Sequence, residues 1–208
     1  MALIIGVDLD NTIINYDQAF FRNALQLGLI DKNCVASKKS IRDRIRRLED
    51  GDAKWHELQA IVYGPKIGQA ELMPGVKRFF QLCRSTTTQV YIVSHKTKFV
   101  RLGEQKTNLR EAALHWMHEN GFFSQQVFGL SDEQVFFELE RRRKIDRIKM
   151  LNCSHFIDDL EETFREGSFP ENVVKLLFSP GEGNTRLEDV KVFTHWDDLS
   201  RFFFDVCN

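Results

Sequence analysis

The sequence has few cysteines and no long apolar run. Its four cysteines, Cys34, Cys83, Cys153 and Cys207, are far apart and form no C-x-x-C pair, which argues against a zinc site and a disulfide framework. We therefore expect free thiols in a reducing cytosol. No apolar run approaches the roughly 20 residues that span a bilayer. The N-terminal segment lacks the basic region and the completed apolar region of a signal peptide, so we expect a soluble, cytoplasmic protein.

An excess of charge of one sign is also missing. The chain has 29 basic and 30 acidic residues and a formal net charge of −1, so nothing global favours nucleic acid or a membrane surface as a partner. Hydrophobic residues make up 42% and charged residues 28%, a composition too apolar for a disordered chain. The 208 residues are enough for one full core with a small accessory element.

Short apolar runs recur along the sequence, and most of them end in polar residues. They occupy residues 3–7, 90–93, 135–137, 155–157, 173–178 and 190–193. Segments with helical periodicity lie between them, at residues 76–83, 108–120, 142–151 and 196–204. This alternation predicts an α/β fold with a doubly wound, mostly parallel sheet and helices on both faces. Ligands of such folds bind beyond the carboxyl ends of the strands.

Residues 14–73 interrupt this alternation, because no convincing buried strand occurs in them. Their pattern predicts helices at residues 17–27, 37–49 and 55–63, the last closed by Gly64 and Pro65. We therefore predict a Rossmann-like core of residues 1–13 and 74–208 with a helical insert of residues 14–73. The segment between Ser94 and Val135 predicts mostly one helix plus loops.

Asp8 and Asp10 follow the first apolar run. In an extended backbone the two side chains point the same way. Adjacent carboxylates repel one another unless a cation shares their charge, and hard oxygen ligands suit Mg²⁺. For this pair alone, the alternative is a solvated strand end at which Asp10 or Asn11 caps a turn.

Other strand ends add groups of matching chemistry. Ser94 offers a hydroxyl at the end of the second run, and Asp158 and Asp159 end a later one. Lys144 begins the helix that precedes this later run. Together with Asp8, these residues could provide a nucleophile, a metal site and a cradle for phosphate.

These motifs resemble those of the haloacid dehalogenase (HAD) superfamily of aspartate-nucleophile phosphatases, and the resemblance covers nearly the whole chain. Its four motifs occur in order as Asp8-Leu9-Asp10-Asn11-Thr12, Ser94, Lys144 and Asp158-Asp159. The first motif, joined to the fourth at the right separation, is the strong signal. The insert after the first motif resembles a small helical cap of the first-insertion type, which would select the leaving group.

The resemblance implies an Mg²⁺-dependent phosphatase that hydrolyses a small-molecule phosphate monoester through an aspartyl-phosphate. Asp8 would attack phosphorus, and Asp10 would first protonate the leaving alkoxide and then activate water. Mg²⁺ would be held by Asp8, the backbone carbonyl of Asp10, and Asp158. Asp159 would either tune the metal or cap the following helix.

The resemblance also implies a phosphate-binding set. Thr12 and Ser94 would bind phosphate oxygens, and a lysine would offset charge that builds on the phosphoryl group. His95 and Lys96 follow Ser94 in a loop that must face the pocket or its rim, so both are candidate substrate contacts.

Two lysines precede the fourth motif. Lys144 lies fourteen residues before Asp158 and Lys149 only nine. Because a helix must fit between the lysine and the strand, we assign the phosphate-binding role to Lys144. The alternative is that Lys144 is one more cation of a solvated basic cluster at residues 141–144.

Asp10 also bears on the type of reaction, because members of the superfamily that cleave carbon–halogen bonds lack the second aspartate. Hydrolysis of a phosphoester is therefore favoured over dehalogenation. A mutase that transfers the phosphoryl group on the same site, and a binding or regulatory protein without turnover, are the alternatives. We expect a small-molecule phosphoester as partner, with neither nucleic acid nor membrane, and the sequence leaves the oligomeric state open.

Overall fold

The structure is a computed structural model that describes residues 3–181 and 185–204. The chain forms two compact units. Unit 1 comprises Met1–Ile13, Leu72–Lys96 and Asn120–Asn208, and unit 2 comprises Ile14–Glu71 and Thr97–Glu119. No helix within the described residues combines the length and the apolar character needed to cross a membrane.

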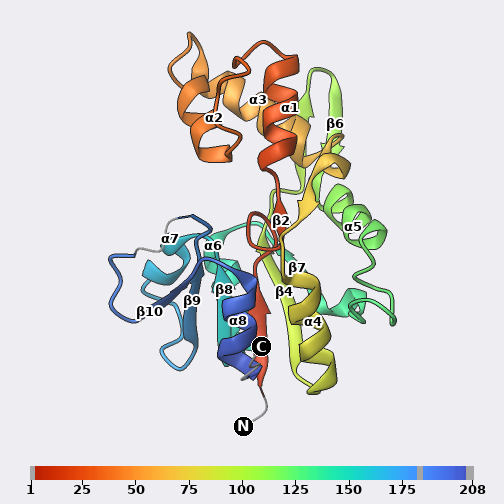
Figure 1. Ribbon diagram of the computed structural model, residues 1–208, viewed down its shortest axis with the longest axis vertical. Helices are drawn as coiled ribbons and strands as arrows, with labels where there is room; N and C mark the ends of the chain where they lie inside the picture. Colours follow the sequence, from red (N-terminus) through yellow and green to blue (C-terminus); the bar gives the residue numbers. More distant parts are fainter. Residues whose placement is uncertain (1–2, 182–184, 205–208) are drawn as a thin grey trace. The chain divides into compact units, whose positions relative to one another are not determined.

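A six-stranded parallel sheet forms the centre of unit 1, in the order β10-β9-β8-β1-β4-β7 (Figure 1). Its strands are β1 (Ile4–Val7), β4 (Gln89–His95), β7 (Val135–Glu138), β8 (His155–Asp158), β9 (Val174–Phe178) and β10 (Val190–Phe193). Val7 of β1 pairs with Ile92 on one side and Ile157 on the other. After β1 the chain adds strands first on the β4 side of the sheet and then on the β8 side. The switch point, at which α/β folds bind ligands, therefore lies between β1 and β8. The predicted doubly wound parallel sheet is confirmed.

Helices cover both faces of this sheet. On one face, α4 (Val76–Ser85) packs against α8 (Trp196–Phe204), with ring centroids of Phe79 and Trp196 5.0 Å apart. The Trp196 ring also contacts Phe178 of β9, at 5.5 Å between centroids. The other face is covered by α6 (Arg141–Met150) and the short helix α7 (Glu161–Arg165).

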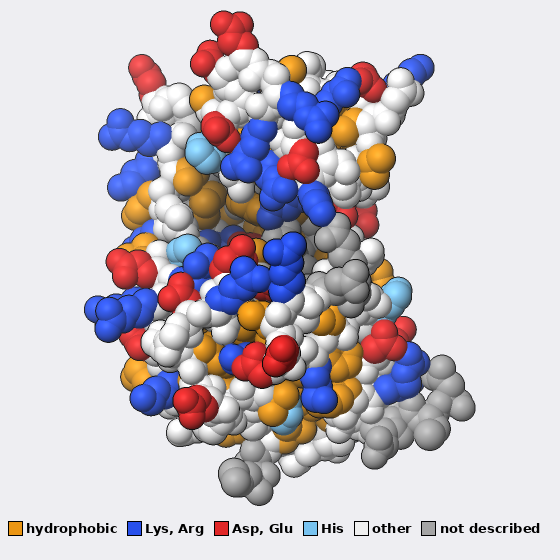
Figure 2. Space-filling view, turned by 90° about the vertical axis from the view of Figure 1, so that its left-hand side faces the viewer, with side chains coloured by type: hydrophobic (Ala, Val, Ile, Leu, Met, Phe, Trp, Pro, Cys, Tyr) orange, Lys and Arg blue, Asp and Glu red, His pale blue; other side chains and the backbone are white. Residues whose placement is uncertain are grey.

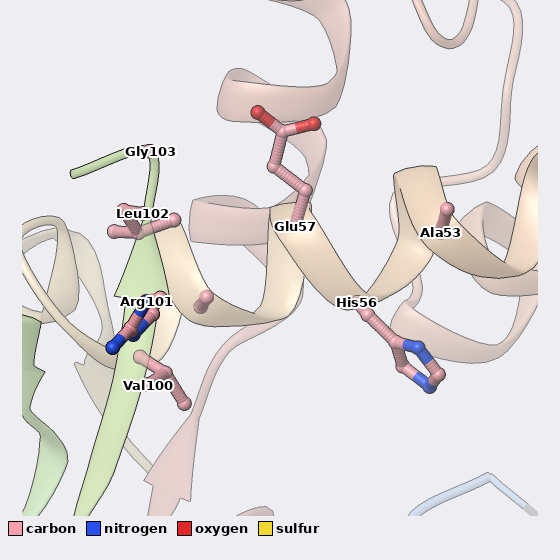
Figure 3. A pocket seen from close by; sticks show the side chains of 8 residues that line it. Ala53, His56, Glu57, Val100, Arg101, Leu102 and Gly103 are labelled. Atoms are coloured by element: carbon pink, nitrogen blue, oxygen red, sulfur yellow. The ribbon is translucent and has the colours of Figure 1, made fainter. Parts of the chain in front are cut away.

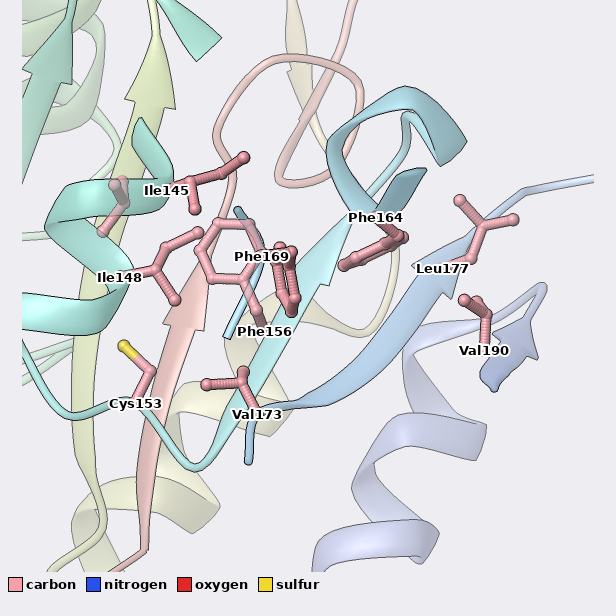
Figure 4. Close-up of a cluster of buried hydrophobic side chains, with 10 residues drawn as sticks. Ile145, Ile148, Cys153, Phe156, Phe164, Phe169, Val173, Leu177 and Val190 are labelled. Carbon is pink, nitrogen blue, oxygen red and sulfur yellow. The ribbon is translucent and has the colours of Figure 1, made fainter. Parts of the chain in front are cut away.

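A cluster of buried side chains fills the space under α6 and α7 (Figure 4). Ile145 and Ile148 of α6 and Phe164 of α7 pack there with Phe156 of β8. Gly6 of β1 lies against this cluster, because a Cβ atom at this position would come within 2.5 Å of the Phe156 ring. The central strand therefore needs glycine at this point, since protein interiors are close-packed.

Unit 2 combines the helical insert with a later segment. It contains α1 (Asp17–Gln26), α2 (Lys38–Ile45), α3 (Gly51–Tyr63), the short 3-10 helix η1 (Ile67–Gln69), the antiparallel hairpin of β5 (Phe99–Leu102) and β6 (Gln105–Asn108), and α5 (Leu109–Glu119). Two further short strands, β2 (Ile14–Asn15) and β3 (Glu71–Leu72), pair with each other. Phe20 of α1 stacks on Trp55 of α3, with centroids 5.0 Å apart.

Residues 97–119 thus pack with the insert, whereas the division made from the sequence placed them in the core. Trp116 of α5 is fully buried, and its indole N–H donates to the carbonyl of Ala70 at 3.1 Å. Gly64, at the end of α3, lies so close to β6 that a Cβ there would be 2.8 Å from the Thr107 side chain. No apolar run marks the hairpin, because its strands carry exposed charged residues such as Arg101 and Lys106.

The surface of unit 2 contains a groove of about 440 Å³ between α3 and β5 (Figure 3). It is lined by Ala53, His56, Glu57, Ala60, Val100, Arg101, Leu102 and Gly103. No residue assigned to the site from the sequence is among them. On the face shown in Figure 2, basic and acidic side chains are interspersed, in line with the balanced charge of the sequence.

Candidate active site

The motif residues of unit 1 meet at the carboxyl ends of its central strands. Asp8 directly follows β1, and its backbone N–H still donates to the carbonyl of Ile157 in β8 at 2.9 Å. Asp158 is the last residue of β8. Ser94 lies near the end of β4, two residues beyond the partner of Val7. Parallel pairing therefore brings these three side chains to one edge of the sheet, as the sequence predicts.

Lys144 joins the two buried carboxylates of this edge. Its Nζ donates to Asp8 Oδ1 at 2.6 Å and to Asp158 Oδ2 at 2.7 Å, and all three side chains are buried. Lys144 shares the buried face of α6 with Ile145 and Ile148, one helical turn apart. Lys149 is exposed near the far end of this helix. Of the two lysines considered from the sequence, the structure thus places Lys144 at the carboxylates.

The charges of this cluster do not balance. Burial raises the pKa of Asp8 to about 6, and the nearby carboxylates of Asp158 and Asp10 add to the effect of burial, while Lys144 opposes it. Burial works to lower the pKa of Lys144, but Asp158 and Asp8 outweigh it and hold that pKa above its usual range. One ammonium group faces two buried carboxylates, so the cluster lacks one positive charge.

Asp8, Asp158 and Asp159 form a group of oxygen donors that could bind a metal ion. Each offers a carboxylate oxygen, and these oxygens lie within 4.8 Å of one another. Carboxylate oxygens are the donors that hard divalent cations prefer. The Asp10 carboxylate is not part of this group, so the metal contact implied for Asp10 is its backbone carbonyl.

Asp159 contacts the turn after β1. Its Oδ2 accepts a hydrogen bond from the side-chain amide of Asn11 at 3.3 Å. Asn11 itself has a left-handed backbone with φ of 62°. The N-cap residue of α7 is Leu160, one position beyond Asp159. The two roles considered for Asp159 from the sequence, metal tuning and helix capping, stay predictions.

Two hydroxyls, Ser94 Oγ near the end of β4 and Thr12 Oγ1 in the turn after β1, are buried without a hydrogen-bond partner among the described residues. The backbone around Thr12 is fixed, since its carbonyl accepts the indole N–H of Trp196 at 3.0 Å. A buried hydroxyl without a partner costs about 1–3 kcal/mol. Both side chains therefore carry donors for which the described part of the chain supplies no acceptor.

The two residues after Ser94 differ in their surroundings. Lys96 is buried, and its Nζ donates to Asp10 Oδ2 at 2.6 Å. His95 is exposed, and its Nε2 lies 2.8 Å from the carbonyl oxygen of Leu139. Of the two candidate substrate contacts, Lys96 is therefore the one among the charged groups of the site.

The sequence did not reveal three supporting contacts. These are the pairing of Lys96 with Asp10, the bond from Asn11 to Asp159, and the bond from Trp196 to the Thr12 carbonyl. Each joins residues more than 80 positions apart, so no local pattern could signal it. A weak hint was available for Trp196, because a buried indole N–H needs an acceptor.

No protein-family model matches the chain, and no curated protein matches its sequence. Solved structures do match over nearly the full length. A haloacid dehalogenase-like family hydrolase from Streptococcus pneumoniae is 16% identical, with a TM-score of 0.60, over 97% of this chain and 98% of that one. A HAD family hydrolase from Deinococcus radiodurans R1, solved with bound phosphate and sodium, is 11% identical, with a TM-score of 0.58, over 98% and 96%.

A dehalogenase solved as an intermediate complex is 10% identical, with a TM-score of 0.56, over 97% of this chain and 96% of that one. These likenesses show the fold. The chain has the α/β fold of the HAD hydrolases, as its motifs predict.

Proposed function

We propose that the chain is a magnesium-dependent phosphatase that hydrolyses a small-molecule phosphate monoester, with Asp8 as the nucleophile. The observation that supports this most strongly is the pair of buried hydroxyls, Thr12 Oγ1 and Ser94 Oγ, that have no partner among the described residues. A phosphoryl group carries oxygens that accept hydrogen bonds, so one ligand could satisfy both donors. Ser94 lies near the end of β4, and Thr12 lies in the turn after β1, four residues beyond Asp8.

The donor set fits Mg²⁺. Asp8 and Asp158 carry two negative charges against the one positive charge of Lys144, and the Asp159 carboxylate lies beside them. A divalent ion held by these carboxylates and by the Asp10 carbonyl would supply the missing positive charge and polarise a phosphoryl oxygen.

The first half of the reaction transfers the phosphoryl group to Asp8. A carboxylate oxygen of Asp8 bonds to phosphorus while the bond from phosphorus to the leaving oxygen breaks, and the Asp10 carboxylic acid gives its proton to that oxygen. In the second half, water attacks phosphorus and gives a proton to the Asp10 carboxylate. The bond to Asp8 then breaks, so inorganic phosphate leaves and both aspartates return to their starting states.

The remaining residues hold the phosphoryl group. Thr12 and Ser94 donate hydrogen bonds to its oxygens, and Lys144 stabilises the charge that develops on them. Lys144 also fixes the rotamer of Asp8, because its ammonium contacts that carboxylate directly. Phosphate bound to the Deinococcus radiodurans HAD hydrolase, which shares this fold, agrees with the proposal.

Phosphate release tests the proposal. 4-Nitrophenyl phosphate and a panel of sugar phosphates and nucleotides are assayed with Mg²⁺ and with chelator, beside Asp8→Asn and Asp10→Asn. We expect Mg²⁺-dependent turnover that falls by at least about 10³-fold in Asp8→Asn. Turnover that survives the chelator, or persists in Asp8→Asn, would contradict the mechanism. Halide release from a 2-haloacid, without phosphate release from any ester, would favour a dehalogenase instead.

A further inference from the structure

We infer that Lys96 is a positioning residue for the proposed reaction, because it holds the Asp10 carboxylate out of the metal site and in place for proton transfer to the leaving group. The inference rests on the proposed function. It concerns only groups of unit 1.

The contact between Lys96 and Asp10 is short and largely shielded from water. Nζ lies 2.6 Å from Oδ2, and the side chains of Lys96 and Asp10 are 3% and 19% exposed. Burying an ammonium group costs several kcal/mol unless a partner repays the lost hydration. A lysine in this position therefore serves the Asp10 carboxyl group, since an apolar side chain would fill the same space at lower cost.

The sheet fixes the lysine more firmly than the turn fixes the aspartate. Lys96 directly follows β4, and its backbone N–H donates to the carbonyl of Glu138 in β7 at 2.9 Å. Asp10 lies in the turn after β1, next to the left-handed Asn11. Lys96 thus ties a side chain on the turn to the rigid sheet, which restricts the rotamers of Asp10.

The two buried lysines divide the carboxylates between them. Lys144 contacts Asp8 and Asp158, which belong to the metal-binding group, and Lys96 contacts Asp10, whose carboxylate lies outside it. A carboxylate two residues from the nucleophile would be expected to turn toward a divalent ion. Lys96 contacts Oδ2 of this group, so the proton that the leaving oxygen needs is carried on Oδ1.

The need for that proton depends on the leaving group, and this provides the test. A 2,4-dinitrophenolate leaves without protonation, whereas an alkoxide does not. Single-turnover phosphorylation of the enzyme is measured for Lys96→Met with 2,4-dinitrophenyl phosphate and with an alkyl phosphate that the wild type accepts. We expect a loss of about 100-fold with the alkyl ester and of less than about 3-fold with the aryl ester. The ratio compares two substrates on one preparation, so partial misfolding does not affect it.

An equal loss with both esters would overturn the inference, because it is the pattern of a lysine that binds the phosphoryl group or only supports the fold. A double-mutant cycle gives a second readout. In the Asp10→Asn background, Lys96→Met should cause no further loss of rate with the alkyl ester. A double variant whose loss of rate equals the product of the two single losses would overturn the inference. Lys96→Arg should recover part of the alkyl-ester rate, and the exposed Lys77→Met of α4 should keep the wild-type rate with both esters.

The outcomes separate this inference from the function on which it rests. If the wild type releases no phosphate from any ester, or Asp8→Asn remains active, both fail. If the wild type and Asp8→Asn behave as proposed while Lys96→Met loses activity equally with both esters, only the role of Lys96 fails.

Discussion

Replacement of Lys144 by methionine should destabilise unit 1 strongly in the absence of a divalent ion. Lys144 is 2% exposed, and its ammonium bridges Asp8 and Asp158 at 2.6 and 2.7 Å. Without it, two buried carboxylates face each other with no cation between them. Removing one partner of a buried ion pair typically costs about 3–5 kcal/mol, and here two anions lose the same partner, so we expect the upper part of that range.

Urea denaturation with a chelator measures this loss. Mg²⁺ should then narrow the gap between Lys144→Met and the wild type, because the ion binds the folded carboxylates and replaces the missing positive charge. An ion at 100 times its dissociation constant stabilises by about 2.7 kcal/mol. Lys149→Met is the matched control, since this exposed lysine lies on the same helix and its loss should cost less than about 0.5 kcal/mol. A Lys144→Met protein within about 1 kcal/mol of the wild type in chelator would refute the reasoning.

Three further predictions concern the same unit. Thr12→Val and Ser94→Ala should leave the unfolding free energy unchanged or raise it, because each removes a buried hydroxyl without a partner, and should lower kcat/KM for phosphate esters by at least about 10-fold. A clear loss of stability would show that the fold needs these hydroxyls. Gly6→Ala should lower the free energy of unfolding by about 1–3 kcal/mol, measured by urea denaturation, because the added methyl group would clash with Phe156 of β8. Gly167→Ala, at a position with open space around it, should leave that free energy almost unchanged. Burial raises the pKa of Asp8 from its ordinary 3.8 to about 6 in the folded protein. Between these two pH values, in chelator, the folded state holds a proton that the unfolded state has lost, so the free energy of unfolding should fall as the pH rises from about 4 to about 6. Across this pH range, urea denaturation should show that the wild type loses on the order of 3 kcal/mol of unfolding free energy relative to Asp8→Asn. An unchanged difference between the two proteins would contradict the raised pKa of Asp8.

The placement of these polar side chains at strand ends was predictable because it depends on local patterns. Asp8, Ser94 and Asp158 each end or follow an apolar run, and parallel pairing brings the ends of β1, β4 and β8 to the same edge. The choice of Lys144 over Lys149 followed from the helix length needed before β8. These steps use only the order of elements along the chain and the geometry of a parallel sheet.

The division into units was less predictable, because it depends on contacts between distant segments. The hairpin of β5 and β6 has charged residues on its exposed face, and α5 follows it without any marker that assigns it to the insert. The fully buried Trp116 decides this through its bond to Ala70, 46 positions away. Lys96 is a similar case, because its place after Ser94 suggested a substrate contact while its charge is directed at Asp10.

Binding of beryllium trifluoride tests the central claim most directly, because this mimic of a phosphoryl group on aspartate requires no knowledge of the natural ester. Fluorine NMR reports the bound species. The account predicts bound resonances for the wild type with Mg²⁺ that disappear on addition of a chelator and are missing in Asp8→Asn. The same resonances in Asp8→Asn, or none in the wild type with Mg²⁺, would contradict the assignment of Asp8 as a metal-assisted nucleophile.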